Sequence, residues 1–200
     1  MVGWPAATFP FMSSAVPHQI SSLLNLTHLD IGLHGEVSKE GINILASLPI
    51  LSALTVTLFD DKEGDSAIFH PRHAIRSQGS QLLVKFTFLC WSEAALEFEP
   101  GAMPKLQRLK LLLLARCQFK YGDGGLVLGL QNLAGLKYVH FRIDCGAATA
   151  DEVDSLEDDI RGAAGVHHNR PIVQVERWYQ GSMAHGCSRQ PSGYPTLEAP

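Results

Sequence analysis

Four histidines are the residues of this sequence whose types and spacing could first suggest chemistry at a metal ion. His70 and His73 flank a Pro-Arg pair, and His167 is followed directly by His168. No cysteine lies near the first pair, and zinc in proteins takes three or four ligands at suitable spacing. We therefore interpret these histidines as ordinary solvated side chains and expect no metal site.

A run of carboxylates could likewise suggest a calcium site. It lacks the Asp-x-Asp-x-Asp-Gly spacing that wraps this ion. Acidic residues in the first turns of a helix are favoured by its positive end, which accounts for the run without a ligand. The carboxylates are Asp151, Glu152, Asp154, Glu157, Asp158 and Asp159.

The glycine cluster GDGG at 122–125 is the one candidate for a phosphate-binding loop. Leu and Val follow it, so it has neither the lysine nor the hydroxyl that cradle a triphosphate and its magnesium. We interpret it as a turn and expect no ATP binding. The chain also has no Gly-x-Ser-x-Gly elbow, and no Cys, His and Asp combination stands out. The sequence predicts neither an enzyme nor a cofactor.

Charge and composition exclude further classes of function. Sixteen basic and 20 acidic residues give a net charge of 16 − 20 = −4, which provides no electrostatic reason to expect nucleic acid or a membrane as partner. No apolar run approaches the roughly 20 residues of a membrane span. The first 38 residues contain no Lys or Arg, so the charged start of a signal peptide is missing. Four cysteines without a CxxC pair are typical of buried thiols in a reducing compartment, and we expect a cytoplasmic protein.

What remains is a repeated pattern of apolar residues that must position the polar ones. Leu-x-x-Leu-x-Leu, with substitutions, occurs five times, and the first residues of successive units lie 25, 32, 23 and 30 positions apart. This spread brackets the roughly 20–29 residues of a leucine-rich repeat. The units are Leu26/Leu29/Ile31, Leu51/Leu54/Val56, Leu83/Phe86/Phe88, Leu106/Leu109/Leu111 and Leu136/Val139/Phe141.

Each unit predicts one short strand, and successive strands would pair in parallel along the inner wall of an arc. The second and third apolar positions would point into the core, and the residues between them to the concave surface. The stretches 39–49 and 125–136 predict a turn or two of helix on the convex side. The fold class is therefore α/β: a leucine-rich-repeat solenoid with a curved parallel sheet and short helices or loops on its convex side.

We divide the chain into four parts. Residues 1–20 are expected to be an irregular segment, and 21–145 to hold about five repeats, with a polar surface loop over 59–80. Residues 146–179 predict a capping helix, with Val153, Leu156, Ile160, Ala163 and Ala164 on one face, and a final strand. Residues 180–200 are rich in Gly, Pro and Ser and are expected to be a disordered tail.

Several of these stretches resemble one protein family. They are LTHLDIGLHGEVSKEGINILASLPILSALTVTL, LEFEPGAMPKLQRLKL, GLQNLAGLKYVHFRI and, after the acidic helix, RPIVQVE. They resemble the carboxy-terminal repeat region of cereal coiled-coil nucleotide-binding leucine-rich-repeat disease resistance proteins, over roughly residues 10 to 178. The resemblance implies a module of an intracellular immune receptor. Family members carry a nucleotide-binding module upstream, and this chain has no motif for one, so we interpret it as a fragment, a truncated product or a stand-alone repeat protein.

The predicted concave wall becomes basic and partly aromatic toward the carboxy end, at Lys85, Arg108, Lys110, Tyr138, His140 and Arg142. Tyr and Arg are common at binding hot spots, so we expect a protein partner there, either a pathogen effector or a switch domain of the receptor. Exposed strand positions are also polar in proteins that bind nothing. A substrate-recruiting repeat region of an F-box-type ubiquitin-ligase adaptor is the alternative function, and a hydrolase is disfavoured by the missing nucleophile. The uncharged amino-terminal segment also predicts self-association.

Overall fold

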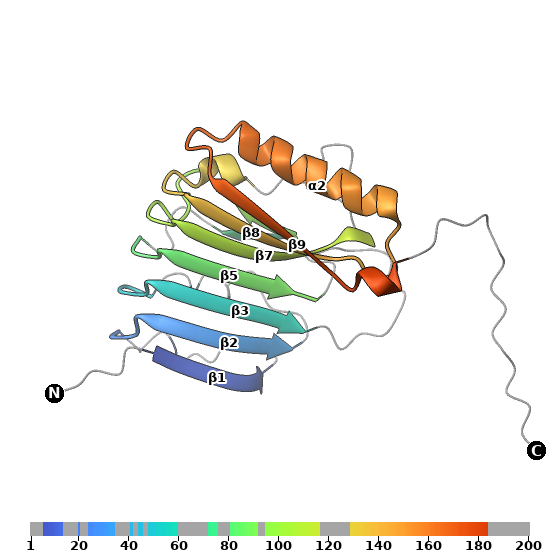
Figure 1. Cartoon of the computed structure of the whole chain (residues 1–200). Coiled ribbons are helices and arrows are strands. Elements are labelled where there is room, and N and C mark those ends of the chain that lie inside the picture. Colours follow the sequence, from blue (N-terminus) through green and yellow to red (C-terminus); the bar gives the residue numbers. More distant parts are fainter. Residues whose placement is uncertain are drawn as a thin grey trace, which may run out of the picture.

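The main feature of the computed structural model is a parallel β-sheet of seven strands (Figure 1). The structure describes residues 6–13, 20, 24–34, 41, 44–45, 48–59, 72–75, 81–91, 95–116 and 129–183. Within these ranges the strands stack in the order β1-β2-β3-β5-β7-β8-β9, with every neighbouring pair parallel. Their bounds are β1 Ala6–Ser13, β2 His28–His34, β3 Ala53–Phe59, β5 Lys85–Cys90, β7 Arg108–Leu114, β8 Tyr138–Asp144 and β9 Ile172–Trp178. The predicted solenoid class is confirmed.

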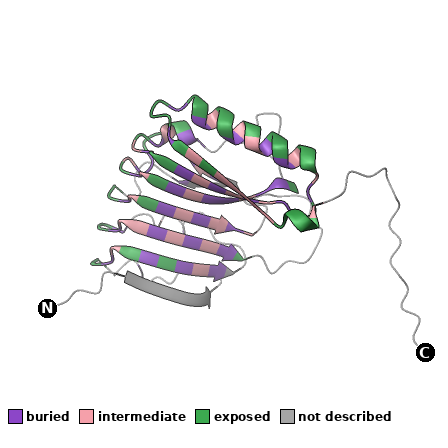
Figure 2. Cartoon of the chain, viewed as in Figure 1, coloured by how far each residue is buried: buried purple, intermediate pink, exposed green. Residues whose placement is uncertain are grey.

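The repeated leucine pattern produces this sheet because each unit buries the same three positions. All fifteen apolar residues of the five units are buried, and each is at most 7% exposed. The strand register aligns the second position of every unit across the sheet, and burial alternates along the strands (Figure 2). The aligned residues are Leu29, Leu54, Phe86, Leu109 and Val139. A single unit could not bury this face, so the strands depend on their neighbours.

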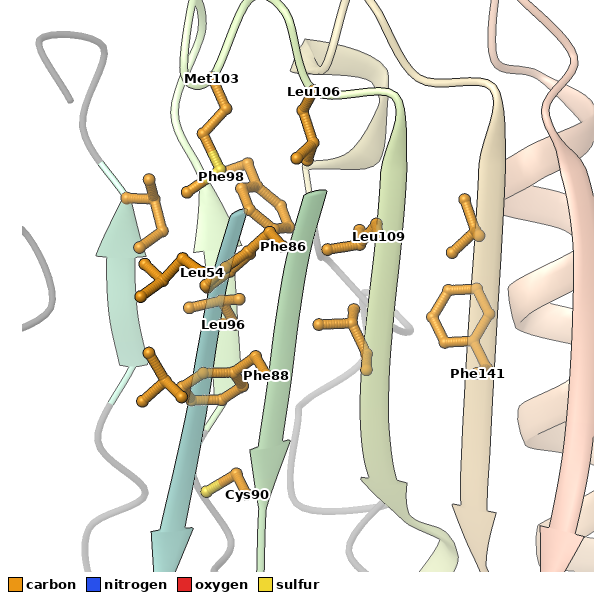
Figure 3. Close-up of a cluster of buried hydrophobic side chains, with 14 of the residues drawn as sticks. Leu54, Phe86, Phe88, Cys90, Leu96, Phe98, Met103, Leu106, Leu109 and Phe141 are labelled. Atoms are coloured by element: carbon orange, nitrogen blue, oxygen red, sulfur yellow. The ribbon is translucent and has the colours of Figure 1, made fainter. Parts of the chain in front are cut away.

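Phenylalanines fill the core at the third repeat. Figure 3 shows Phe86 packed beside Phe98, and their ring centres lie 6.4 Å apart in an edge-to-face arrangement. Phe98 belongs to β6, Ala95–Phe98, which pairs in parallel with β4, Arg72–Ile75, in a second sheet of two strands. Leu96 and Ile75 are also buried, so this small sheet covers part of the core.

Two predictions about irregular segments are wrong in part. Residues 1–20 were expected to be irregular, but residues 6–13 form β1, which satisfies its backbone groups by parallel pairing with β2. Residues 59–80 were expected to be a surface loop, but β4 lies within them and Ile75 is fully buried. The polar composition around Ile75 hides its inward position. The rest of 60–80 lies outside the described residues.

The convex connections contain helical residues where the structure describes them. In the stretch 125–136, the described residues 129–136 include a three-residue 3-10 helix, η3 (Leu130–Asn132). Gly129 precedes it with φ of 60°, and a Cβ there would collide with the carbonyl oxygen of Phe98. The Asn132 side-chain amide donates to the same oxygen at 2.8 Å, which ties this connection to β6. In 39–49, Gly41, Ile44 and Leu45 are helical, and residues 39–40, 42–43 and 46–47 lie outside the described residues.

A helix and the last strand close the array at its carboxy end. Helix α2, Ala150–Gly165, begins at a capping box in which Thr149 N donates to Glu152 Oε2 at 2.6 Å and Glu152 N donates to Thr149 Oγ1 at 3.3 Å. Four of the five residues predicted for its inner face are buried and Ala163 is partly buried. Arg177 of β9 reaches α2 through Glu157 at 2.6 Å and Asp154 at 2.7 Å. Part of the acidic run thus anchors the cap.

The expected disordered tail starts with ordered residues. Gln180–Ser182 form a second 3-10 helix, η4, and Met183 packs against the core. The amide of Ala147 donates to the Ser182 carbonyl at 2.9 Å, which fixes this turn to the loop before α2. Residues 184–200 lie outside the described residues.

Candidate protein-binding face

The strand register brings all six predicted binding residues to one face of the main sheet. This is the face turned away from the core, which we call the concave face. Lys85, Arg108 and Tyr138 form one row across β5, β7 and β8. Lys110 and His140 form the next row, and Arg142 lies in the third row beside Leu112. Positions two residues apart on adjacent strands therefore build a contiguous surface, as the alternation of a strand requires.

The row at the amino-terminal ends of the strands is open. Lys85 and Arg108 are exposed, and Tyr138 is 45% exposed. The guanidinium carbon of Arg108 lies 5.4 Å from the centre of the Tyr138 ring, within the range of a cation–π contact. Ile172 of β9 continues the row beside Tyr138 and is 64% exposed. An exposed apolar side chain, Ile172, thus lies next to Tyr138 at the end of the row.

The opposite end of the concave face is filled by the chain's own side chains. Arg142 Nε donates to Glu176 Oε2 at 3.1 Å, and the Arg142 guanidinium carbon lies 4.1 Å from the centre of the Trp178 ring. Trp91 lies against Trp178 with the ring centres 6.5 Å apart. Leu112, the register partner of Arg142, is only 4% exposed although it lies outside the main core cluster. Little of this end is available to a partner.

His140 lies between these two ends in a crowded, charged environment. Its Nε2 is 3.2 Å from Glu176 Oε2, but the atom is buried and makes no aligned hydrogen bond within the part of the chain that the structure describes. Burial lowers the pKa of His140 and the charge of Lys110 lowers it further, while Glu176 opposes both. Burial is also the main cause of the lowered pKa of Lys110, followed by the charge of Arg142.

The pKa of Glu176 is lowered, first by a hydrogen bond from Trp178 and then by its contacts with Arg142. Its carboxylate is therefore ionised at neutral pH and balances the charge of Arg142, whereas the lowered pKa of His140 favours its neutral imidazole. Among the six predicted residues, these two are engaged internally. Lys85, Arg108 and Lys110 form no ion pair among the described residues.

The residues that β9 contributes to this face were not predicted from the sequence. Ile172, Gln174, Glu176 and Trp178 alternate with the inward Val173 and Val175, as in the earlier strands. The signal was present in the sequence, but the strand was assigned to the cap rather than to the binding wall.

The histidines and the glycine cluster that were considered for metal or phosphate binding are described only in part. His167 is buried, its Nδ1 accepts from Asn169 N at 3.1 Å, and its ring stacks on His168 at 4.5 Å. His73 lies in β4, whereas His70 and the glycine cluster 122–125 fall outside the described residues. In the described ranges, no three His, Cys, Asp or Glu residues are grouped as metal ligands.

Cys90 and Cys145 are buried and form no disulfide bond, and burial raises the pKa of Cys145. Cys117 and Cys187 lie outside the described residues. Across the same described stretches, no helix is both long and apolar enough to cross a membrane.

Comparison with known proteins gives two findings. The family model for a leucine-rich repeat region matches residues 7–173. Disease resistance protein RGA5 of rice (Oryza sativa subsp. japonica) is 30% identical over 136 residues, which cover 68% of this chain. The chain spans 11% of the length of that relative.

Proposed function

The chain belongs to the leucine-rich repeat region family, and on that premise we propose that it is a non-catalytic protein-recognition module of a plant immune receptor. The similarity to part of a rice disease resistance protein supports a role in defence. Leucine-rich repeat regions generally mediate protein–protein interactions, which supports a protein as the partner. That partner is a pathogen protein or a switch domain of the receptor to which the repeats belong.

The observation that carries this proposal is the open cationic surface on the concave face. Lys85, Arg108 and Lys110 lie on adjacent strands and have no carboxylate partner among the described residues. Unpaired cations of this kind steer and orient an acidic partner. Tyr138 adds a rigid aromatic surface of the type found at binding hot spots. The partner is therefore an acidic protein surface.

Charge reversal on this surface tests the proposal. The full chain fused to a biotin ligase is expressed in rice leaf protoplasts, either unchanged or as the double variant Arg108→Glu/Lys110→Glu. We expect the set of labelled proteins to lose its acidic members in the variant. The matched control Lys105→Glu/Lys137→Glu makes the same change in net charge at two exposed lysines outside the strands and keeps that set. Equal loss in both variants, or none in either, contradicts the proposal.

We also propose a cytoplasmic location. Cys90 and Cys145 are buried and form no disulfide bond, as expected in a reducing compartment. Fractionation of cells expressing the tagged chain tests this, and recovery from the secreted fraction would exclude it.

A further inference from the structure

The concave face is divided into an open half and a closed half. At the carboxy-terminal ends of the strands, Glu176 and Trp178 hold Arg142, and Leu112 is buried beside it. At the amino-terminal ends, the residues of the row from Lys85 to Ile172 are exposed. The open row, with Lys110 next to it on β7, is therefore the part of the face available to a partner.

The open row also changes in chemistry from one end to the other. After His28 and Ala53, the row continues with two cations, Lys85 and Arg108, then an aromatic ring at Tyr138, and it ends with an aliphatic side chain at Ile172. Ile172 is 64% exposed, and a partner that covers this β-branched apolar side chain lowers the free energy of the complex. A purely acidic partner would leave that end of the row in water. The order of side chains calls for acidic and apolar groups in sequence.

We infer that the open row of the concave face binds an extended acidic segment that carries one apolar anchor and crosses the strands. This inference rests on the proposed function and narrows it. The segment's carboxylates lie on Arg108 and Lys85, and its apolar side chain packs against Tyr138 and Ile172. Arg142 contributes much less because Glu176 already balances its charge, and His140 contributes much less because its Nε2 atom is buried.

The spacing of the strands sets the spacing within the segment. Neighbouring strands lie about 4.8 Å apart, so Arg108 and Lys85 are two and three strand separations from Ile172, roughly 10 and 14 Å. An extended chain advances about 3.3 Å per residue. The acidic residue and the apolar anchor are therefore separated by about three or four positions.

Selection from a random peptide library tests this prediction. A phage-displayed library is panned against the immobilised full chain, and the enriched sequences are read. We expect an Asp or Glu about three or four positions from a Leu, Ile or Phe. Enriched peptides without an acidic residue would overturn the inference. So would a separation of about seven or more positions, because a helix advances only about 1.5 Å per residue and would need that length.

Variants then locate the bound peptide. The affinity of one enriched, fluorescently labelled peptide is measured by anisotropy. Arg108→Gln and Ile172→Ser each weaken binding about tenfold, as expected for losing one charged contact or one buried side chain. The matched controls Lys105→Gln and Val166→Ser change exposed residues of the same kinds off the row and leave the affinity unchanged. Thermal melting verifies that each variant is folded.

The outcomes separate this inference from the proposed function. If Ile172→Ser binds as well as the unchanged chain, the apolar anchor is wrong while an acidic partner still stands. If Arg142→Gln weakens binding more than Arg108→Gln, the division of the face is wrong. If no peptide is enriched, the inference fails, and charge reversal in protoplasts still decides the function independently.

Discussion

Glu176 on β9 pairs with Arg142 on the neighbouring strand β8, with the Arg142 Nε atom 3.1 Å from the Glu176 Oε2 atom. The pair joins the capping strand to the last repeat on the concave face. It also removes the positive charge of Arg142 from the surface that a partner would meet. One carboxylate thus both completes the solenoid and limits its binding face.

The same carboxylate sets the protonation of His140, which gives a first prediction. Glu176 raises the pKa of His140 against the larger lowering by burial and by Lys110. Glu176→Gln removes the negative carboxylate that favours the charged imidazole, so the pKa of His140 falls further below its ordinary value. Titration of the His140 ring protons by NMR measures the shift. A pKa that rises in the variant would show that Glu176 does not act on this ring.

Leu109 tests the core of the repeat. Its side chain is 2% exposed and aligns with Phe86 and Val139 in the neighbouring strands. Leu109→Ala lowers the free energy of unfolding by about 2–5 kcal/mol, because the cavity is lined on both sides. The neighbouring Arg108 is exposed, and Arg108→Ala changes stability by less than about 0.5 kcal/mol. Denaturant unfolding measures both, and the reverse order of effects would mean that the strand faces the other way.

The strands and their inward faces were predictable because the determinant is local. Leu106, Leu109 and Leu111 repeat a period that occurs elsewhere in the chain, and only parallel stacking buries all of them. Ile75 was missed because the polar stretch around it shows no apolar period that would predict its burial. Its burial comes from pairing with β6, more than 20 positions away in the sequence. Such pairings cannot be inferred from neighbouring residues.

The candidate site was predictable in position but not in charge balance. Alternation placed Lys85 and Arg108 on one face, and the register confirms that placement. It could not show that Glu176 would reach Arg142, because that contact depends on the capping strand continuing the main sheet in parallel. Once β9 is in place, the exposure of Ile172 also has meaning, since Tyr138 lies beside it.

Arg177 tests how the cap is held. Its Nε donates to Glu157 at 2.6 Å and an outer nitrogen to Asp154 at 2.7 Å. Arg177→Gln breaks both contacts and leaves Glu157, whose side chain is 14% exposed, without this cation. We expect a loss of about 1–3 kcal/mol and faster hydrogen exchange in α2. Arg161→Gln breaks a surface pair on the same helix and costs less than about 0.5 kcal/mol. Equal exchange in both variants would show that Arg177 does not anchor the helix.

The strand β1 predicts self-association of the chain. It is the outermost strand of the described sheet, and its eight residues, Ala6–Ser13, carry no charge. Uncharged edge strands pair readily with other chains. We expect oligomers by analytical ultracentrifugation, and Thr8→Lys, which adds a charge to β1, reduces them. Gln131→Lys adds the same charge at an exposed residue of η3 and serves as the control. A stable monomer of the unchanged chain would refute this prediction.

Site-specific photo-crosslinking tests whether a protein partner binds to the concave face. A photoreactive phenylalanine analogue replaces Tyr138 on that face or Asp158 on the exposed surface of α2, and the chain is irradiated in rice leaf protoplasts. We expect a discrete protein adduct from position 138, and we expect Arg108→Glu to abolish it. We expect no such adduct from position 158. Adducts from position 158 with none from position 138 would contradict this expectation.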